Sequence, residues 1–225
     1  MRSVLLAIAL CAPAALAQEV KLAFVEGPVA VVPSGGGAEQ PASAGTILHP
    51  GDTVQTREGA RVEIEVPGGS IIRLGESTRL TVTDSVPQRA FSARLFLGNL
   101  WTKVHKLVAG ESFQVETENG VAGVRGTEFR VEAAPGQPDL IRVYEGAVQV
   151  GDDRVEPGQE LRFRRGAKAE LKTFDPQSER GHRFMEWVRS RREADGSEPG
   201  KVRRQDRNPE RENLRRERRQ KRREQ

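Results

Sequence analysis

Short runs of alternating apolar and polar residues, separated by glycine turns, constrain the fold of this chain more than any other feature. Residues 60–66 read Ala-Arg-Val-Glu-Ile-Glu-Val, and residues 91–97 alternate in a similar way. A period of two places every second side chain on one face of a β-strand, so that one face is buried and the other is wet. Such strands recur between positions 18 and 174, and no amphipathic helical period of useful length interrupts them. The sequence therefore predicts an all-β domain there.

Residues 121–131 form the most specific stretch in this domain. Small and apolar residues lead into an Arg-Gly-Thr corner at residues 125–127, and apolar and charged residues then alternate along a strand. Glycine suits such corners because it adopts backbone dihedrals that a side chain forbids. We interpret the stretch as structural, and its defining residues are Gly123, Val124, Arg125, Gly126, Thr127 and Phe129.

Two residues are candidates for contacting a ligand. Arg125 lies between apolar Val124 and Gly126, where burial would require hydrogen bonds to carbonyls or to a carboxylate. We expect Arg125 to tie neighbouring segments together, and a ligand contact is the alternative. Trp101 lies on a strand beside Lys103; a core or edge position is favoured, and a surface anchor is the alternative.

A short motif recurs along the chain and bears on the architecture. Residues 26–31 read Glu-Gly-Pro-Val-Ala-Val, residues 145–150 read Glu-Gly-Ala-Val-Gln-Val, and residues 98–104 are a looser echo. A repeated strand–glycine–strand unit favours coils stacked into a solenoid-like roll with glycine at its corners. An antiparallel sandwich, which also needs glycine at its corners, is the alternative.

The residue patterns typical of catalysis or metal binding are missing from the sequence. His49, His105 and His182 are far apart, and none has the spacing of a metal-binding helix. Glu63 and Glu65 lie at i and i+2 on a strand, which is typical of a solvated sheet face. We therefore predict no catalytic residues, no metal and no cofactor. An enzyme whose residues meet only in the tertiary structure is the alternative.

The N-terminus predicts export from the cytoplasm. Arg2 precedes an apolar run at residues 4–16, and Ala-Leu-Ala follows at 15–17, so residues 1–17 read as a secretory signal peptide. Cys11 lies inside this segment, which leaves the mature chain without cysteine. Acylation of Cys11 is disfavoured because Leu10 stands where a lipoprotein signal needs a small residue. A periplasmic or secreted location follows.

The last fifty residues differ from the β domain. Asp175-Pro176 resembles a helix start, and Phe184, Trp187 and Val188 then form an apolar stripe. We expect residues 175–193 to be a helix that docks on the β domain. Residues 194–225 are rich in arginine and have almost nothing to bury, so we expect a disordered or frayed helical tail.

The positive charge of the chain belongs to its C-terminus. Residues 189–225 contain 15 Lys and Arg against 8 Asp and Glu, a net +7, whereas residues 1–188 contain 21 against 24, a net −3. A nucleic-acid partner is disfavoured because acids interrupt the tail and aromatic residues are missing from it. The expected partners are an envelope protein, an anionic envelope polymer or a lipid surface. A tail that only improves solubility is the alternative.

Several motifs, in order, resemble the FecR domain of bacterial envelope proteins. The resemblance covers roughly residues 51–159. It rests on Gly51–Thr56, Gly59–Ile64, Gly69-Ser70, Arg73–Gly75, Leu97–Trp101, Val121–Val131, Tyr144–Val150 and Pro157–Gln159.

This resemblance implies a regulatory role in the envelope. Well-known members of the family are transmembrane sensors that relay iron–siderophore transport to a sigma factor through a cytoplasmic segment. This chain has a signal peptide in place of that segment and of the membrane span, which puts direct control of a sigma factor in doubt. Our leading hypothesis is a non-catalytic binding or scaffold module, tethered by its basic tail. A component of iron/siderophore-type signalling that works with a separate membrane partner is the alternative.

Overall fold

The computed structural model describes residues 19–86, 90–179 and 181–195 of the chain. It divides into two compact units, residues 1–178 and 179–225, which we treat separately. Strands make up 51% of the structure, which confirms the predicted all-β fold. The predicted signal peptide and most of the arginine-rich tail lie outside the described residues.

The first unit, here called the β domain, contains two ladders of hydrogen-bonded strands. In sheet A, neighbouring strands are antiparallel and follow the order β4, β1, β6, β7, the second half of β9, β12, β13, β16 and β17. Their bounds are β4 Ile47–Leu48, β1 Val20–Glu26, β6 Arg61–Val66, β7 Ser70–Leu74, β9 Ala90–Lys103, β12 Glu128–Ala133, β13 Asp139–Glu145, β16 Gln159–Phe163 and β17 Glu170–Thr173.

Sheet B has the order β3, β2, β5, β8, the first half of β9, β10, β11, β14 and β15. Its pairs are antiparallel except for β9 and β10, which run parallel. The remaining bounds are β3 Gln40–Pro41, β2 Val29–Val32, β5 Thr53–Thr56, β8 Arg79–Val86, β10 Ser112–Glu116, β11 Val121–Val124, β14 Val148–Val150 and β15 Asp153–Val155.

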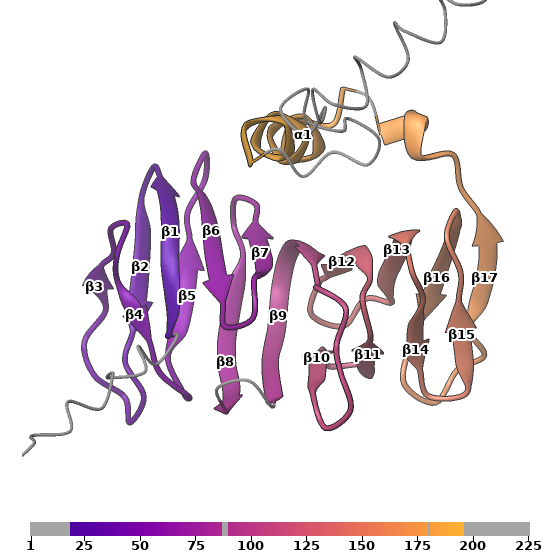
Figure 1. Cartoon of the computed structure of the whole chain (residues 1–225), viewed down its shortest axis with the longest axis horizontal. Coiled ribbons are helices and arrows are strands. Elements are labelled where there is room, and N and C mark those ends of the chain that lie inside the picture. Colours follow the sequence, from indigo (N-terminus) through magenta and orange to yellow (C-terminus); the bar gives the residue numbers. More distant parts are fainter. Residues whose placement is uncertain (1–18, 87–89, 180, 196–225) are drawn as a thin grey trace, which may run out of the picture. The chain divides into compact units, whose positions relative to one another are not determined.

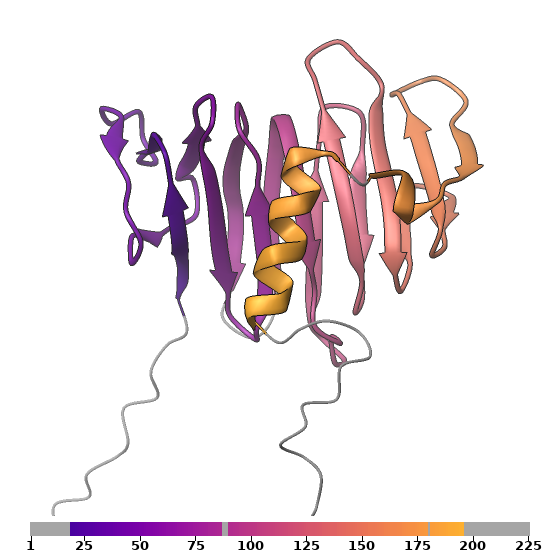
Figure 2. The ribbon, with the colours of Figure 1, turned by 90° about the horizontal axis from the view of Figure 1, so that it is seen from above.

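Successive hairpins along the chain are added to the two sheets in turn. The hairpins β10–β11, β12–β13, β14–β15 and β16–β17 belong alternately to sheet B and sheet A. In Figure 1 the strand colours accordingly run in sequence order along the β domain, and the perpendicular view in Figure 2 shows the same order. The structure therefore has the strand order of the predicted roll, and its two sheets share one core as a sandwich does.

The apolar members of the alternating runs fill the space between the sheets. Ile64 and Phe129 of sheet A and Leu95 of sheet B are completely buried and belong to one continuous hydrophobic cluster. Burial of such side chains contributes about 1.5–3 kcal/mol each. The period-two pattern of the sequence thus identified the core face of both sheets.

Strand β9 joins the two sheets at Gly98. Residues 90–97 pair with β8, and residues 98–103 pair with β7 and β12. Gly98 has a φ of +102°, and a Cβ on it would lie 2.6 Å from the Cα of Thr78. A side chain there would be strained and would also collide with the neighbouring backbone. Glycine is therefore required where the chain crosses from one sheet to the other.

The predicted C-terminal helix begins later than the sequence indicates. Asp175 caps only a 3₁₀ turn, Pro176–Glu179, because its Oδ1 accepts a hydrogen bond from the amide of Gln177 at 2.8 Å. Gly181 follows with a φ of +89°, and the α-helix α1 spans Arg183–Asp195. The docking of this helix on the β domain stays a prediction. None of the helices in the described ranges is long and apolar enough to span a bilayer.

Candidate functional site

A hollow of about 520 Å³ lies on the outer face of sheet B. Its lining includes Arg79, Arg94, Phe96, Val121 and Arg165, together with the carboxylates of Glu116 and Glu118. These side chains come from β8, β9, β10, the start of β11 and the β16–β17 turn. We call this hollow the Phe96 groove. Its volume is within the range of ligand-binding clefts.

Phe96 lies on the outer face of sheet B by the alternation of β9, which also turns Arg94 outward, and the ladder between β8 and β9 is irregular at this point. Arg79 pairs with Leu97 and Leu80 pairs with Leu95, so Phe96 is an extra residue without a direct partner on β8. Leu95 is buried in the core, whereas Phe96 is 41% exposed and Val121, across the groove, is 45% exposed. Two large apolar side chains therefore face solvent within one hollow.

The guanidinium groups of the groove differ in how they are neutralised. Arg94 donates two hydrogen bonds to Oε2 of Glu116, at 2.7 and 3.1 Å. The guanidinium of Arg79 lies over the Phe96 ring, 5.4 Å from its centroid, and the Arg165 guanidinium donates to the carbonyl of Glu118. Within the described ranges neither Arg79 nor Arg165 forms an ion pair with a carboxylate. Two cationic groups are therefore available to an anionic ligand.

A second hollow of about 260 Å³ continues the groove past Phe96. Arg79 and Phe96 line both hollows, and the second adds Val32, Thr53, Gln55 and Thr81. The hydroxyls of Thr53 and Thr81 are 2.6 Å apart and hydrogen-bonded to one another. The two hollows together offer an apolar centre with polar side chains on either side.

A buried carboxyl group supports the turns at the rim of the groove. Asp139 is 1% exposed, and its Oδ2 is buried without a hydrogen-bond partner among the described residues. Asn119 donates to the carbonyl of Gln137 at 2.9 Å and accepts from the amide of Arg165 at 3.3 Å. Burial raises the pKa of Asp139 above its usual value and outweighs the opposing effect of the neighbouring Thr117 and Asn119. The turns at this rim are therefore held together around a titratable group.

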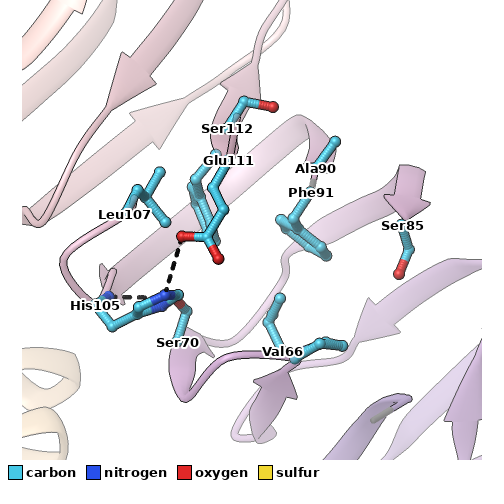
Figure 3. Close-up of a pocket in the computed structure, with 11 residues that line it drawn as sticks. Val66, Ser70, Ser85, Ala90, Phe91, His105, Leu107, Glu111 and Ser112 are labelled. Carbon is cyan, nitrogen blue, oxygen red and sulfur yellow. Dashed lines mark hydrogen bonds and ion pairs between the residues drawn. The ribbon is translucent and has the colours of Figure 1, made fainter. Parts of the chain in front are cut away.

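A Ser–His–Glu cluster lies elsewhere, in the small pocket of Figure 3. Ser70 Oγ is 2.9 Å from Nδ1 of His105, and Nε2 of the same ring is 3.6 Å from Oε2 of Glu111. This order of groups resembles a hydrolytic triad. However, Ser70 is 1% exposed, and its Oγ also accepts a hydrogen bond from the amide of His105 at 3.3 Å. The cavity of about 30 Å³ has room for about two water molecules, not for a substrate.

The pocket instead joins a loop to a hairpin. A Cβ on Gly68, in the β6–β7 turn, would lie 2.7 Å from Cε1 of His105, so the ring packs directly against this turn. Glu111 Oε2 accepts a hydrogen bond from the amide of Val108 at 2.8 Å. His105 and Glu111 therefore fasten the loop after β9 to the end of sheet A.

Arg125 is exposed at this corner. Its Nε donates one hydrogen bond to the carbonyl of Leu107 at 3.0 Å. Val124 next to it is only partly buried. The role of Arg125 as a tie between segments and its contact with a ligand both stay predictions.

Trp101 is 1% exposed, so the surface-anchor interpretation is wrong and a buried position is correct. It alternates with Leu100 and Thr102 on β9, and the core cluster includes Leu100 but not Trp101. The guanidinium of Arg73 lies 4.9 Å from the centroid of its ring. Trp101 therefore belongs to the outer face of sheet A and is not part of the Phe96 groove.

The interpretation of Glu63 and Glu65 as part of a solvated sheet face is wrong for Glu63 and correct for Glu65. Its carboxylate is 7% exposed and accepts a hydrogen bond from Nε of the fully buried Arg73 at 2.7 Å. Glu65 is exposed, as expected, and pairs with Lys21 at 3.1 Å. Alternation along one strand could not reveal this difference, because Arg73 reaches Glu63 only through the register of β6 and β7.

The corner at residues 125–127 packs closely against the segment that contains residues 146 and 147. Thr127 Oγ1 donates to the carbonyl of Ala147 at 2.8 Å, and a Cβ on Gly146 would lie 2.5 Å from the carbonyl oxygen of Gly126. The stretch 121–131 and the recurring motif at 145–150 therefore meet in space with no room between them. Over the described ranges, no group of three His, Cys, Asp or Glu side chains could hold a metal ion.

Residues 52–149, from the start of β5 to β14, match the family model described as FecR protein. The chain contains a FecR domain. The match lies within the segment 51–159 that resembled FecR in sequence. Most of the Phe96 groove, including Arg79, Phe96 and Val121, belongs to the FecR domain, whereas Arg165 lies beyond the match. No curated protein is detectably similar in sequence to the whole chain.

Two solved structures resemble the FecR-domain chain. Both are described as a "putative anti-sigma factor from Parabacteroides distasonis ATCC 8503", at 18% and 19% identity and TM-scores of 0.49 and 0.48. In each case the similarity covers 56% of this chain and 61% of the other.

Proposed function

We propose that this chain is a non-catalytic binding module that acts outside the cytoplasm and contacts its partner through the Phe96 groove. The observation that carries the proposal is the exposure of Phe96 beside the guanidinium of Arg79, which has no carboxylate partner within the described ranges. Aromatic residues and arginine are the residue types enriched at the energetic centres of binding interfaces. Their position on a rigid sheet lets the groove bind a partner at little cost in ordering.

A binding role is favoured over an enzymatic one by the geometry of the Ser70 cluster. Ser70 has its Oγ engaged with His105 twice, and the adjoining cavity is too small for a substrate. The Phe96 groove is large enough, but its carboxylate Glu116 is neutralised by Arg94 and also accepts from Ser92 Oγ at 3.0 Å. A carboxylate held in this way is a poor general base.

A signalling role is the second candidate, and the FecR domain is the observation that favours it. In this version the groove would contact a separate membrane partner, for example one in iron/siderophore-type signalling. A partner identified as a membrane receptor or sensor would support it.

The proposal also includes export of the chain by its N-terminal segment and its attachment to an anionic surface by its C-terminal tail. Residues 1–17 would direct the chain to the periplasm or the exterior, and the tail, 194–225, would bind anionic polymer or lipid through its arginines. Deletion of residues 194–225 is expected to release the chain from vesicles containing anionic lipid without lowering its melting temperature. Equal retention of both forms would contradict the tether.

The test of the groove is affinity capture from the envelope fraction of the cells that express the chain. The baits are the whole mature chain and its variants Phe96→Ala and Arg165→Gln. Leu171→Ala and Arg164→Gln are matched controls, because both side chains are exposed and neither lines the groove. The wild type and both controls should retain the same partner, whereas the two groove variants should lose it. Equal capture by all five baits, or no capture by any, would refute the groove as the contact surface.

A further inference from the structure

We propose that the Phe96 groove binds a carboxylate-bearing polysaccharide, with one uronic-acid unit over Phe96 and its carboxylate between Arg79 and Arg165. This inference rests on the proposed function of the groove and names its ligand class. It follows from the shape of the groove, from the chemistry of its lining and from the hydrogen bonding of the sheet beneath it.

The shape favours a chain-like ligand. Hollows of about 520 and 260 Å³ lie against the same two side chains, Phe96 and Arg79. A ligand with one ring over Phe96 could therefore continue into the second hollow, toward Thr53 and Thr81. Both hollows are open to solvent among the described residues, so a polymer could lie along the sheet with both its ends free.

The lining matches the three kinds of group on a uronic acid. The C–H face of a sugar ring is flat and apolar, and it can bury the exposed part of the Phe96 ring. The side chains of Thr53, Gln55 and Thr81 can exchange hydrogen bonds with sugar hydroxyls. Arg79 and Arg165, which have no carboxylate partner within the described ranges, can pair with the sugar carboxylate in a bidentate manner.

The charge of the groove also favours an anion. Three guanidinium groups, on Arg79, Arg94 and Arg165, face the carboxylates of Glu116 and Glu118. Because Arg94 and Glu116 neutralise one another, Arg79 and Arg165 remain against the single carboxylate of Glu118, which leaves an excess of one positive charge. A neutral sugar would leave this excess unmatched, so the proposal requires a carboxylate.

The sheet beneath the groove disfavours an extended acidic peptide. The backbone groups of β5, β8 and β9 are paired with one another in the ladder, so a peptide cannot add to this face as a strand. Its own amides and carbonyls would need partners among a few side chains. A polysaccharide has no amide backbone to satisfy, and side-chain hydroxyls and amides are what it binds.

Isothermal titration calorimetry with the whole mature chain tests the proposal. The probes are trigalacturonic acid, its neutral methyl ester and triglutamic acid; short probes limit bridging to the arginine-rich tail. We expect binding of trigalacturonic acid only. Arg79→Gln should weaken it at least about tenfold, since a charge-assisted hydrogen bond is worth this much. Phe96→Ala should weaken it to a similar extent, because the sugar ring loses its apolar contact. Leu171→Ala and Arg164→Gln should bind like the wild type. Unchanged melting temperatures would show that the variants are folded.

Any result other than the one expected above would contradict the polysaccharide proposal. Equal binding by the wild type and the groove variants would place the sugar on the tail, and equal binding of the ester would exclude recognition of the carboxylate. Binding of triglutamic acid alone would assign the groove to an acidic protein segment. If no probe binds but envelope capture still depends on Phe96 and Arg165, the polysaccharide proposal fails while the binding function stands.

Discussion

Replacing Gly98 by alanine tests the account of how the chain passes between the two sheets. Gly98 has a φ of +102°, and a Cβ there would lie 2.2 Å from Oγ1 and 2.6 Å from Cα of Thr78. Thr78 cannot move aside easily. Its amide donates to Thr56 Oγ1 at 2.9 Å, its carbonyl accepts from the amide of Thr56 at 2.9 Å, and its Oγ1 accepts from the amide of Asn99 at 3.0 Å.

The expected cost has two parts. A positive φ in a residue with a side chain costs about 1–2 kcal/mol, and forcing a methyl group against a fixed backbone costs about a further 1–3 kcal/mol. Gly98→Ala should therefore lower the free energy of unfolding by about 2–5 kcal/mol, a large fraction of the stability of a typical domain.

Urea denaturation followed by circular dichroism measures this loss, and Gly110→Ala separates its two parts. Gly110 has a φ of +92°, but nothing lies within 4 Å of the position that a Cβ would take there, so its substitution should cost the backbone part alone. The difference between the variants, about 1–3 kcal/mol, then reports the collision with Thr78. Equal losses in the two variants would show that β9 does not pass Thr78 this closely and would refute the reasoning.

Two further predictions concern Asp139 and Arg125. Because burial raises the pKa of Asp139 in the folded state, its contribution to stability is complete below the unfolded pKa, near 3.8, and is lost as the pH rises through the folded pKa. The unfolding free energy of the wild type relative to Asp139→Asn should therefore fall as the pH rises above the unfolded pKa. Parallel pH profiles in urea titrations would contradict the raised pKa. Arg125→Ala should cost at most about 1 kcal/mol, because it removes one hydrogen bond of an exposed side chain. A loss of unfolding free energy above about 2 kcal/mol in the same assay would indicate that Arg125 belongs to a buried hydrogen-bond network.

Much of the fold was predictable because it depends on local patterns. Alternation over residues 60–66 and 91–97 identified strands and their core faces, and the glycine corners marked the turns between them. The helix start at Asp175 was misplaced because Gly181 interrupts it with a left-handed backbone. The pattern of polar and apolar residues does not predict where a left-handed residue will delay the start of a helix.

The candidate site was largely missed. Phe96 is an apolar residue at an outward position of the alternating strand 91–97, and this was a sequence signal for an exposed aromatic side chain. Arg79 and Arg165 had no comparable signal, because they are two among many arginines and are far apart in the chain. Only the placement of β8 and the β16–β17 turn around one hollow distinguishes them from the rest.

By itself the sequence determined that residues 18–174 form strands with glycine bends and carry a FecR domain, since period-two alternation and backbone freedom at glycine act over a few residues. The tertiary structure alone decided which charges are buried and which face solvent. Glu63 and Glu65 are indistinguishable along β6, yet one is enclosed with Arg73 and the other is exposed. The reason is that burial and pairing depend on the register between strands, which residues on one strand do not encode.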